Sequence, residues 1–169
     1  NEVLLVPAHY DSDSKCDFAV YWPSGGMWMI YQSATQTGTN IAFGWAEAYP
    51  VPGDYDGNGI AQPAVYHPAS GTWLIRNADG TTRVQMWGWS DAIPVPADYD
   101  GDGKYDIAVY SKPDGAWIIL KSSGGTETVT FGWSDMMPLP ADYDGDGIAD
   151  LGGYWPEGGY WYVRSSRDG

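Results

Sequence analysis

The chain has 169 residues and carries 22 acidic against 8 basic side chains, a formal net charge of −14 at pH 7. Such an excess of acid excludes a nucleic-acid backbone as partner and disfavours an anionic membrane surface, since both are bound by Lys and Arg. Aromatic residues make up 15% of the chain, which excludes an acidic disordered segment. The single cysteine excludes an intramolecular disulfide, and no apolar run approaches the ~18 residues of a membrane-spanning helix, so no membrane insertion is expected.

The sequence is built from four repeats of about 44 residues. A Gly-Trp pair recurs every 44 residues, beginning at Gly44, Gly88 and Gly132. A second tryptophan recurs at intervals of 45, 44 and 44 residues, at Trp28, Trp73, Trp117 and Trp161. We therefore expect a single repeat domain over residues 1–169, with units at about 1–45, 46–89, 90–133 and 134–169.

Within a repeat the apolar period is two residues, which favours strands over helices. In the third unit, strands are predicted within 93–99, 106–110, 117–120 and 126–131, separated by turns rich in Gly, Pro, Asp and Ser. Four short antiparallel strands in about 40–50 residues are typical of a β-propeller blade, whereas solenoid coils are usually shorter. The predicted fold is all-β, a β-propeller of about four four-stranded blades.

The last blade is predicted to lack its outer strand. When the repeats are aligned, Asn1 falls opposite Ser134 and Gly169 falls opposite Gly125. The stretch without an equivalent is 126–133, one strand in length. Because the chain opens with Asn1 and shows no signal-peptide pattern, we interpret it as a mature or excised piece.

Acidic loops in the third and fourth repeats each place four carboxylates within nine residues. Carboxylates this close repel one another unless a cation lies among them, and oxygen ligands at alternating positions suit Ca²⁺ before Mg²⁺. A glycine at the sixth position permits the sharp turn, and the seventh residue would offer its backbone carbonyl. A solvated acidic turn without metal is the alternative. The candidate ligands are Asp98, Asp100, Asp102, Lys104 and Asp106, and Asp142, Asp144, Asp146, Ile148 and Asp150.

The first two loops depart from this pattern. The second has neutral amides at two positions, and the first has His9 at its start and Ser14 in place of the turn glycine. We expect two Ca²⁺ sites, in the third and fourth loops, and up to four in all. An EF-hand is excluded, because Val109 and Gly153 stand where its bidentate Glu is required. The remaining candidate ligands are Asp54, Asp56, Asn58 and Ile60 in the second loop, and Asp11, Asp13 and Asp17 in the first.

These motifs resemble the FG-GAP/VCBS repeat family, found in integrin α-chain heads and secreted bacterial proteins. Phe43-Gly44 and Phe131-Gly132 match its Phe-Gly pair, with Trp87-Gly88 as a variant, and 98–106 and 142–150 match its D-x-D-G-D-G-x-x-D loop. The resemblance implies a propeller in which a calcium loop links the two inner strands of each blade. Family propellers commonly have seven or eight blades. This leaves open a compact four-blade ring, half of a ring completed by a second copy, or part of a longer chain.

The aromatic residues raise the possibility of sugar binding. Those repeated in every unit are expected to pack between blades or over the loops. Trp22 and Trp155 occupy a slot that varies between repeats, beside a hairpin turn, and are our candidates for stacking on a glycan. Catalysis is not predicted, since there are only two histidines and no Gly-x-Ser-x-Gly or His-Glu-x-x-His motif.

The predicted function is that of a non-catalytic, calcium-binding propeller module for adhesion or scaffold recognition. Its partner would be a protein or glycan at a cell surface, and its place extracellular or on the cell surface. A lectin-type propeller is the first alternative. The second is a self-assembling surface or filament subunit, a homo-oligomer formed through the open edge of the last blade.

Overall fold

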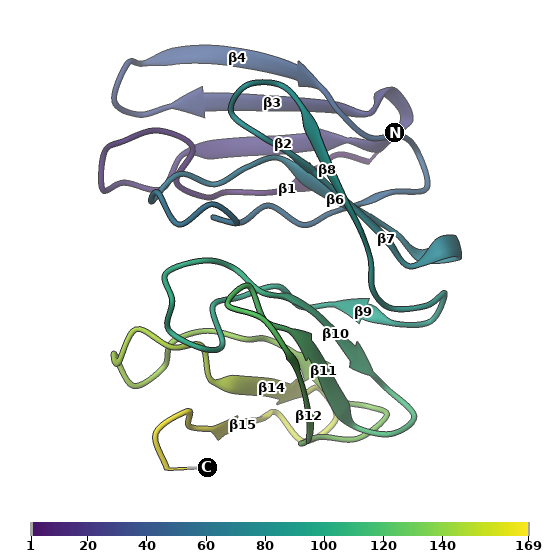
Figure 1. Ribbon diagram of the computed structural model, residues 1–169. Coiled ribbons are helices and arrows are strands. Elements are labelled where there is room, and N and C mark those ends of the chain that lie inside the picture. The colour runs from purple at the N-terminus through teal and green to yellow at the C-terminus, as the bar shows by residue number, and fades with distance from the viewer. Residues whose placement is uncertain (1, 169) are drawn as a thin grey trace. The chain divides into compact units, whose positions relative to one another are not determined.

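The computed structural model describes residues 2–168, which form antiparallel sheets with almost no helix (Figure 1). Three of the sheets have four strands and one has three. The predicted all-β, propeller-type fold is confirmed. No helix in residues 2–168 is long and apolar enough to cross a membrane. The chain divides into two compact units, residues 1–90 and 91–169, and each contains two blades.

The N-terminal unit contains blades 1 and 2. Blade 1 consists of β1 (Leu4–Leu5), β2 (Phe18–Trp22), β3 (Met27–Gln32) and β4 (Thr37–Ala42). Blade 2 consists of β5 (Tyr49–Pro50), β6 (Ala64–His67), β7 (Thr72–Arg76) and β8 (Thr82–Met86). One-turn 3₁₀ helices, η1 (Pro23–Gly25) and η2 (Pro68–Ser70), form the hairpin between the second and third strands.

The C-terminal unit contains blades 3 and 4. Blade 3 consists of β9 (Ile93–Pro94), β10 (Ile107–Ser111), β11 (Ala116–Leu120) and β12 (Thr126–Thr130). Blade 4 consists of β13 (Met137–Pro138), β14 (Leu151–Trp155) and β15 (Tyr160–Arg164). In every blade each strand pairs with its neighbour in the chain, and the acidic loop lies between the first and second strands.

A tyrosine and a tryptophan face each other at the centre of every blade. The paired residues are Tyr21 and Trp28, Tyr66 and Trp73, Tyr110 and Trp117, and Tyr154 and Trp161. Their ring centroids lie 5.1 to 5.3 Å apart. Trp28, Trp73 and Trp117 have no exposed surface, so the repeated tryptophan is a core residue in blades 1 to 3.

Successive blades within a unit share one core. In the N-terminal unit, Trp28 and Ile30 of blade 1 belong to the same buried cluster as Ala61 and Val65 of blade 2. In the C-terminal unit, Trp117 of blade 3 is buried in one cluster with residues of blade 4, Met136 and Leu151. The two blades of a unit therefore bury apolar side chains against each other, as expected of a repeat whose units bury surface against their neighbours.

A segment of sequence aromatic-Gly-Trp follows the fourth strand in blades 1 to 3 and crosses the hairpin of the same blade. We call residues 43–45, 87–89 and 131–133 the straps. The central indole N–H donates to the carbonyl of the first strap residue, 2.8 Å away in all three blades. The facing tyrosine hydroxyl donates to the carbonyl of the strap tryptophan, over 2.7 to 2.9 Å.

The straps require glycine in the hairpin that they cross. Gly26, Gly71 and Gly115 adopt positive φ angles of 56° to 63°, and a Cβ on any of them would lie 2.1 to 2.3 Å from the carbonyl oxygen of the strap glycine. Such a contact is far inside van der Waals distance, so no other residue fits these positions. The repeated hairpin glycine is thus explained by the strap above it.

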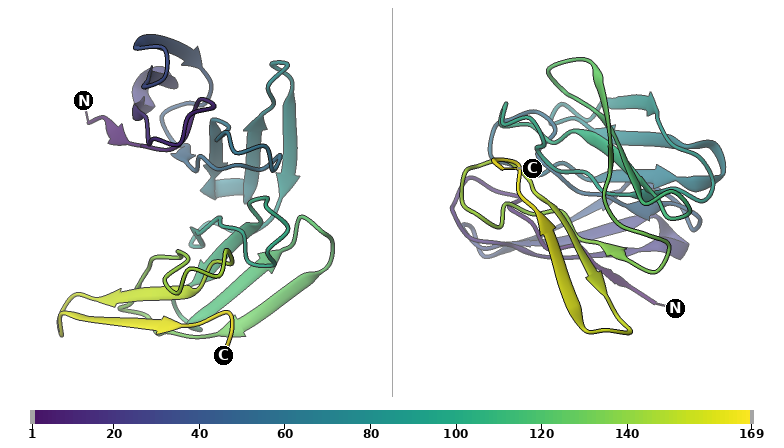
Figure 2. Two further views of the ribbon diagram at one scale, coloured as in Figure 1. Left: turned by 90° about the vertical axis from the view of Figure 1, so that its left-hand side faces the viewer. Right: turned by 90° about the horizontal axis from the view of Figure 1, so that it is seen from below.

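Blade 4 has no fourth strand and no strap within residues 2–168. The yellow strand β15 in Figure 2 accordingly has a neighbour on one side only. Trp161 is 59% exposed. The expectation that the aromatic residues repeated in every unit pack inside the protein is therefore wrong for Trp161, and also for Tyr143, which is 44% exposed. No segment of residues 2–168 covers Trp161 as the straps cover its equivalents.

The equivalent tryptophans should differ sharply in what they contribute to stability. Trp117→Ala should lower the free energy of unfolding by about 3–5 kcal/mol, since it empties a closed core site. Trp161→Ala should cost less than about 1 kcal/mol, as exposed substitutions usually do. Denaturant titration of both variants compares them directly, and equal losses would contradict the described exposure of Trp161.

Candidate functional site

The last carboxylate of each acidic loop anchors that loop to the rest of its blade. Asp106 is fully buried, and its two oxygens accept hydrogen bonds from the backbone amides of Tyr99, 2.9 Å away, and Ser122, 2.7 Å away. Asp17 and Asp150 are held by equivalent pairs of amides. Burial raises the pKa of the Asp106 carboxyl, although these two amides act to lower it.

A neutral side chain holds this anchoring position in blade 2. The Oε1 atom of Gln62 accepts from the Tyr55 amide over 2.7 Å, and its Nε2 donates to the Ile60 carbonyl over 2.9 Å. Gln62 is buried like the aspartates at the equivalent positions. The position therefore serves the fold of the loop even where no charge is present.

The first carboxylate of the loop folds the loop around itself. One oxygen of Asp98 accepts from the Gly101 amide over 2.7 Å and the other from the Gly103 amide over 2.9 Å. Asp54 and Asp142 make the same pair of contacts in their loops. Hydrogen bonds from these amides hold the pKa of the Asp142 carboxyl below its ordinary value, and the amide of Gly147 has the largest effect.

Serines after the third strand orient the middle carboxylates. Ser122 donates its hydroxyl hydrogen to Asp102, and Ser123 donates to Asp100. In blade 4 the same roles fall to Ser166 and Ser165, which donate to Asp146 and Asp144. Sequence reasoning missed these serines. A usable signal was their spacing, since Ser33, Ser122 and Ser166 each follow the anchoring aspartate by 16 residues.

Three of the four loops bring carboxylate oxygens within 4.8 Å of one another. These all-oxygen groups match the donor set that Ca²⁺ prefers, and a carboxylate oxygen that accepts one hydrogen bond keeps a lone pair for a cation. Among the predicted ligands, the groups contain Asp98, Asp100 and Asp106; Asp142, Asp144 and Asp146; and Asp11, Asp13 and Asp17.

Other predicted ligands lie in the loops but outside these groups. Asp102 is held by the Ser122 hydroxyl and the Lys104 amide, which lower the pKa of its carboxyl, and Asp150 acts as an anchor. Carbonyl ligation by Lys104 and Ile148 stays a prediction.

The second loop forms no such group among the described residues and has a protein cation beside it. A guanidinium nitrogen of Arg83 lies 3.9 Å from a carboxylate oxygen of Asp56, and the guanidinium lies over the Tyr55 ring. Asn58 accepts from the Ile60 amide, and Asp54 accepts from amides of its own loop. Of the four loops, the second is thus the least suited to a metal ion.

Neighbouring loops in a unit are joined by one backbone hydrogen bond. The amide of Ala61 donates to the carbonyl of His9 over 2.6 Å, and the amide of Ala149 donates to the carbonyl of Asp98 over 2.7 Å. In both units the bond runs from the eighth residue of one loop to the first residue of the preceding loop. We call it the loop-to-loop bond.

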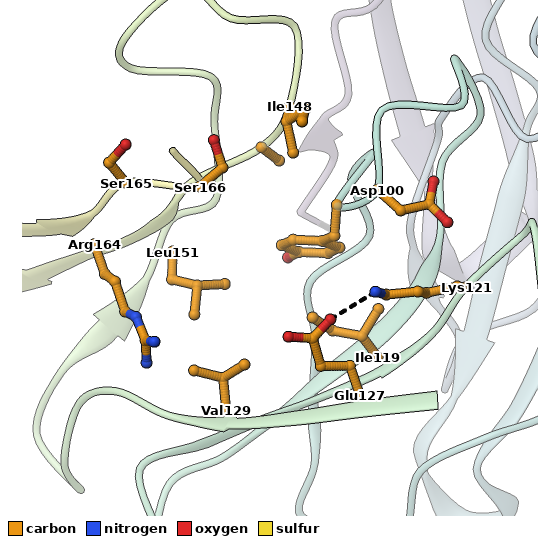
Figure 3. Close-up of a pocket in the computed structure, with 12 residues that line it drawn as sticks. Asp100, Ile119, Lys121, Glu127, Val129, Ile148, Leu151, Arg164, Ser165 and Ser166 are labelled. Atoms are coloured by element: carbon orange, nitrogen blue, oxygen red, sulfur yellow. Dashed lines mark ion pairs between the residues drawn. The ribbon is translucent and has the colours of Figure 1, made fainter. Parts of the chain in front are cut away.

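A cleft of about 330 Å³ opens beside the loops of blades 3 and 4 (Figure 3). Its apolar wall consists of Ile119, Val129, Ile148, Ala149 and Leu151, and Tyr99 lines the cleft as well. Charged and hydroxyl groups surround this wall, among them the ion pair of Lys121 and Glu127, whose atoms lie 2.7 Å apart. The remaining polar side chains that line the cleft are Asp100, Arg164, Ser165 and Ser166. Asp100 and both serines also belong to the loop networks, so loop and cleft share a wall.

The two tryptophans predicted to stack on a glycan lie outside this cleft. Trp22 is 37% exposed at the end of β2. Trp155 is half-buried at the end of β14, while Leu151 at the opposite end lines the cleft. The Trp155 ring stacks on Tyr160 and meets Trp133 edge-on, with centroids 6.4 and 6.2 Å away. Glycan contact by either tryptophan stays a prediction.

No protein-family model and no curated protein matches the chain. Among solved structures, a lectin from Agrocybe aegerita, described as specifically recognising non-reducing terminal N-acetylglucosamine, is 16% identical. It aligns with a TM-score of 0.61 over 97% of this chain and 52% of its own. Virginiamycin B lyase from Staphylococcus aureus is 9% identical, with a TM-score of 0.56 over 96% of this chain and 59% of its own. At these identities the similarity shows the fold alone, and the chain spans little more than half of each neighbour.

The anchoring carboxylate should matter to the fold in the absence of any metal. Asp106→Ala, unfolded by denaturant in a chelator, should lose about 2–4 kcal/mol, because two amides lose their acceptor in a buried site. Asp106→Gln should recover part of this loss, since Gln62 serves one such amide in blade 2. Asp100→Ala is the comparison within the same loop and should cost less than about 1 kcal/mol. Equal losses for Asp106→Ala and Asp100→Ala would contradict the anchoring role.

Proposed function

We propose that the chain is a non-catalytic, calcium-stabilised recognition module that binds carbohydrate in the cleft between blades 3 and 4. The observation that carries this proposal is the composition of the cleft, an apolar wall surrounded by charged and hydroxyl groups. A sugar ring has the complementary character, with an apolar C–H face and a periphery of hydroxyls. The similarity in fold to a lectin supports the proposal.

Calcium would act on the structure of the module. The converging carboxylates exist as groups only in the folded chain, so an ion bound to them stabilises the folded state. Asp100 contributes to a converging group and lines the cleft as well, and Ile148 brings the fourth loop to the same wall. An ion in these loops would therefore fix the wall against which the sugar lies.

The carboxylates of the cleft are placed for binding more than for catalysis. Glycosidases use one carboxylic acid to protonate the leaving group and a second carboxylate as base or nucleophile. Here Glu127 is paired with Lys121, and Asp100 accepts hydrogen bonds from the Asp102 amide and the Ser123 hydroxyl. These contacts suit groups that orient a ligand. A module of this kind would serve adhesion outside the cell, where the calcium concentration is high enough to occupy loops of low affinity.

Calcium should stabilise the protein through the converging loops. Adding about 10 mM Ca²⁺ to chelated protein should raise Tm by several degrees, as expected for binding to the folded state only. Asp100→Asn and Asp144→Asn should each reduce the rise, whereas Asp56→Asn, at the same position of the second loop, should leave it intact. Scanning calorimetry measures Tm in each case. A Tm that does not change when Ca²⁺ is added would contradict the calcium proposal.

Sugar binding should depend on the polar rim of the cleft. A glycan array identifies the preferred sugar, and titration calorimetry then compares variants in saturating Ca²⁺. Arg164→Ala and Glu127→Gln should each weaken binding about tenfold or more, because each removes a group within reach of a sugar hydroxyl. Trp155→Ala, on the same strand pair but outside the cleft, is the matched control. Loss of binding in Trp155→Ala alone would move the site to the tryptophan, and no binding to any glycan would contradict the proposal.

A further inference from the structure

The second acidic loop lacks the ligands that a calcium ion needs. It carries two carboxylates, Asp54 and Asp56, whereas the third and fourth loops carry four each. The carbonyl of Ile60, a predicted ligand, accepts a hydrogen bond from Nε2 of Gln62 over 2.9 Å. An aspartate at the anchoring position cannot donate such a bond. Since Ca²⁺ takes about six to eight oxygen ligands, the residues of this loop do not fit it.

Two positions that act together in the other loops are both changed in blade 2. In blades 1, 3 and 4, the serine 16 residues after the anchor donates its hydroxyl hydrogen to the carboxylate at the fifth loop position. In blade 2 these two positions hold Ala78 and Asn58. Asn58 keeps the bond from the seventh-residue amide that its equivalents also accept. The fold of the loop is thus retained, while a carboxylate and the group that orients it are absent together.

An arginine from the fourth strand contacts this loop at three points. The guanidinium of Arg83 donates to the Tyr55 carbonyl over 3.4 Å and lies 5.9 Å from the centre of the Tyr55 ring. One of its nitrogens is 3.9 Å from a carboxylate oxygen of Asp56. Asp56 is the third loop position, and its equivalents in the other loops all belong to converging carboxylate groups. Arg83 therefore brings positive charge to the place where those loops gather negative charge.

The residue at this position of the fourth strand varies with the charge of the loop. Arg83 is paired with Ile75, and the same position holds Thr39 in blade 1 and Glu127 in blade 3. The loop with the fewest carboxylates is thus accompanied by a cation on the fourth strand. The third loop, with four carboxylates, is accompanied by an acid. The loss of ligands and the presence of the arginine compensate each other in charge.

The cations beside the first and fourth loops are held less firmly. Lys15 and Arg167 each have a nitrogen 3.9 Å from a carboxylate oxygen, but their side chains are 74% and 58% exposed, against 44% for Arg83. Exposed ion pairs of this kind contribute little. Arg83 differs because it extends from a paired strand and also contacts an aromatic ring, that of Tyr55, which is 2% exposed.

We propose that the second loop takes no metal ion and that the guanidinium of Arg83 is its built-in cation. A cation carried by the chain needs no supply from solution, so this loop stays folded when calcium is absent. Through the loop-to-loop bond between Ala61 and His9, it also supports the first loop. The role of Arg83 does not depend on the proposed calcium or sugar binding. The number of ions bound by the chain, three at most, rests on the calcium proposal.

A double-mutant cycle in a chelator tests the role of Arg83 without any metal. Arg83→Met keeps the apolar stem, removes the charge and should lower Tm by about 2–4 °C. Asp56→Asn removes the opposite charge, so the double variant should lose clearly less than the sum of the two single losses. Arg76→Met, on the third strand of the same blade, is the matched control and should be additive with Asp56→Asn. Additive losses for Arg83 and Asp56 would overturn the proposal.

A reconstructed loop tests whether Arg83 occupies the place of an ion. Asn58→Asp, Gln62→Asp and Ala78→Ser introduce the groups found in the other loops. This triple variant is compared with one that also carries Arg83→Thr, the residue of blade 1. Equilibrium dialysis against Ca²⁺ should show one more bound ion per chain after Arg83→Thr than in the original protein. Where Arg83 is retained, the added site should be at least about tenfold weaker, because the guanidinium repels the ion.

The outcomes separate this inference from the calcium proposal. Equal Ca²⁺ affinity of the reconstructed loop with and without Arg83 would overturn the inference. So would the loss of one bound ion on Asp56→Asn in the otherwise unchanged protein, because it would place a metal in the second loop. If no variant binds Ca²⁺ and the original protein binds none, the calcium proposal fails. The coupling between Arg83 and Asp56 in the chelator then decides the inference by itself.

Discussion

A buried carboxylate must be surrounded by hydrogen-bond donors, and the acidic loops are organised around this requirement. Burying an unpaired charge costs several kcal/mol, so the anchoring aspartate is tolerable only where two backbone amides meet it. One amide comes from the second residue of the loop and the other from the turn after the third strand. Satisfying one side chain therefore fixes the loop against the far end of the hairpin. The middle carboxylates, their serines and the wall of the cleft all follow from that attachment.

The features of the fold that recur in the sequence could be predicted from it, because repetition averages out local ambiguity. Strand positions in the third unit, the buried Trp28, Trp73 and Trp117, and the loop positions between inner strands follow from period and spacing. The serine partners were missed because Ser is common in turns and its hydroxyl has no directional signature in sequence. The exposure of Trp161 depends on residues outside the three strands of its blade, since a strap that follows a fourth strand covers the equivalent tryptophans. No pattern confined to residues 151–164 could reveal that dependence.

The first loop shows how geometry can outweigh ligand count. His9 and Ser14 break the sequence pattern, yet Asp11, Asp13 and Asp17 still converge. The reason lies in the contacts made by the remaining groups, since Asp13 is held by the Lys15 amide and Ser33, and Asp11 accepts from the Ala34 amide. In the second loop, Asn58 and Gln62 replace two of the four acids of the full pattern, and a third, Asp56, lies 3.9 Å from Arg83. The hydrogen-bond donors that orient Asp11 and Asp13 thus keep the carboxylates of the first loop together even without an aspartate at its first position.

The loop-to-loop bond couples the folding of the two acidic loops in a unit. Ala61 and His9, like Ala149 and Asp98, share a hydrogen bond that forms only when both loops are folded. Two such loops in a unit behave as adjacent sites of a one-dimensional Ising chain, in which ordering one lowers the free energy of ordering the other. Ion binding within a unit would then be positively cooperative without any contact between the ions.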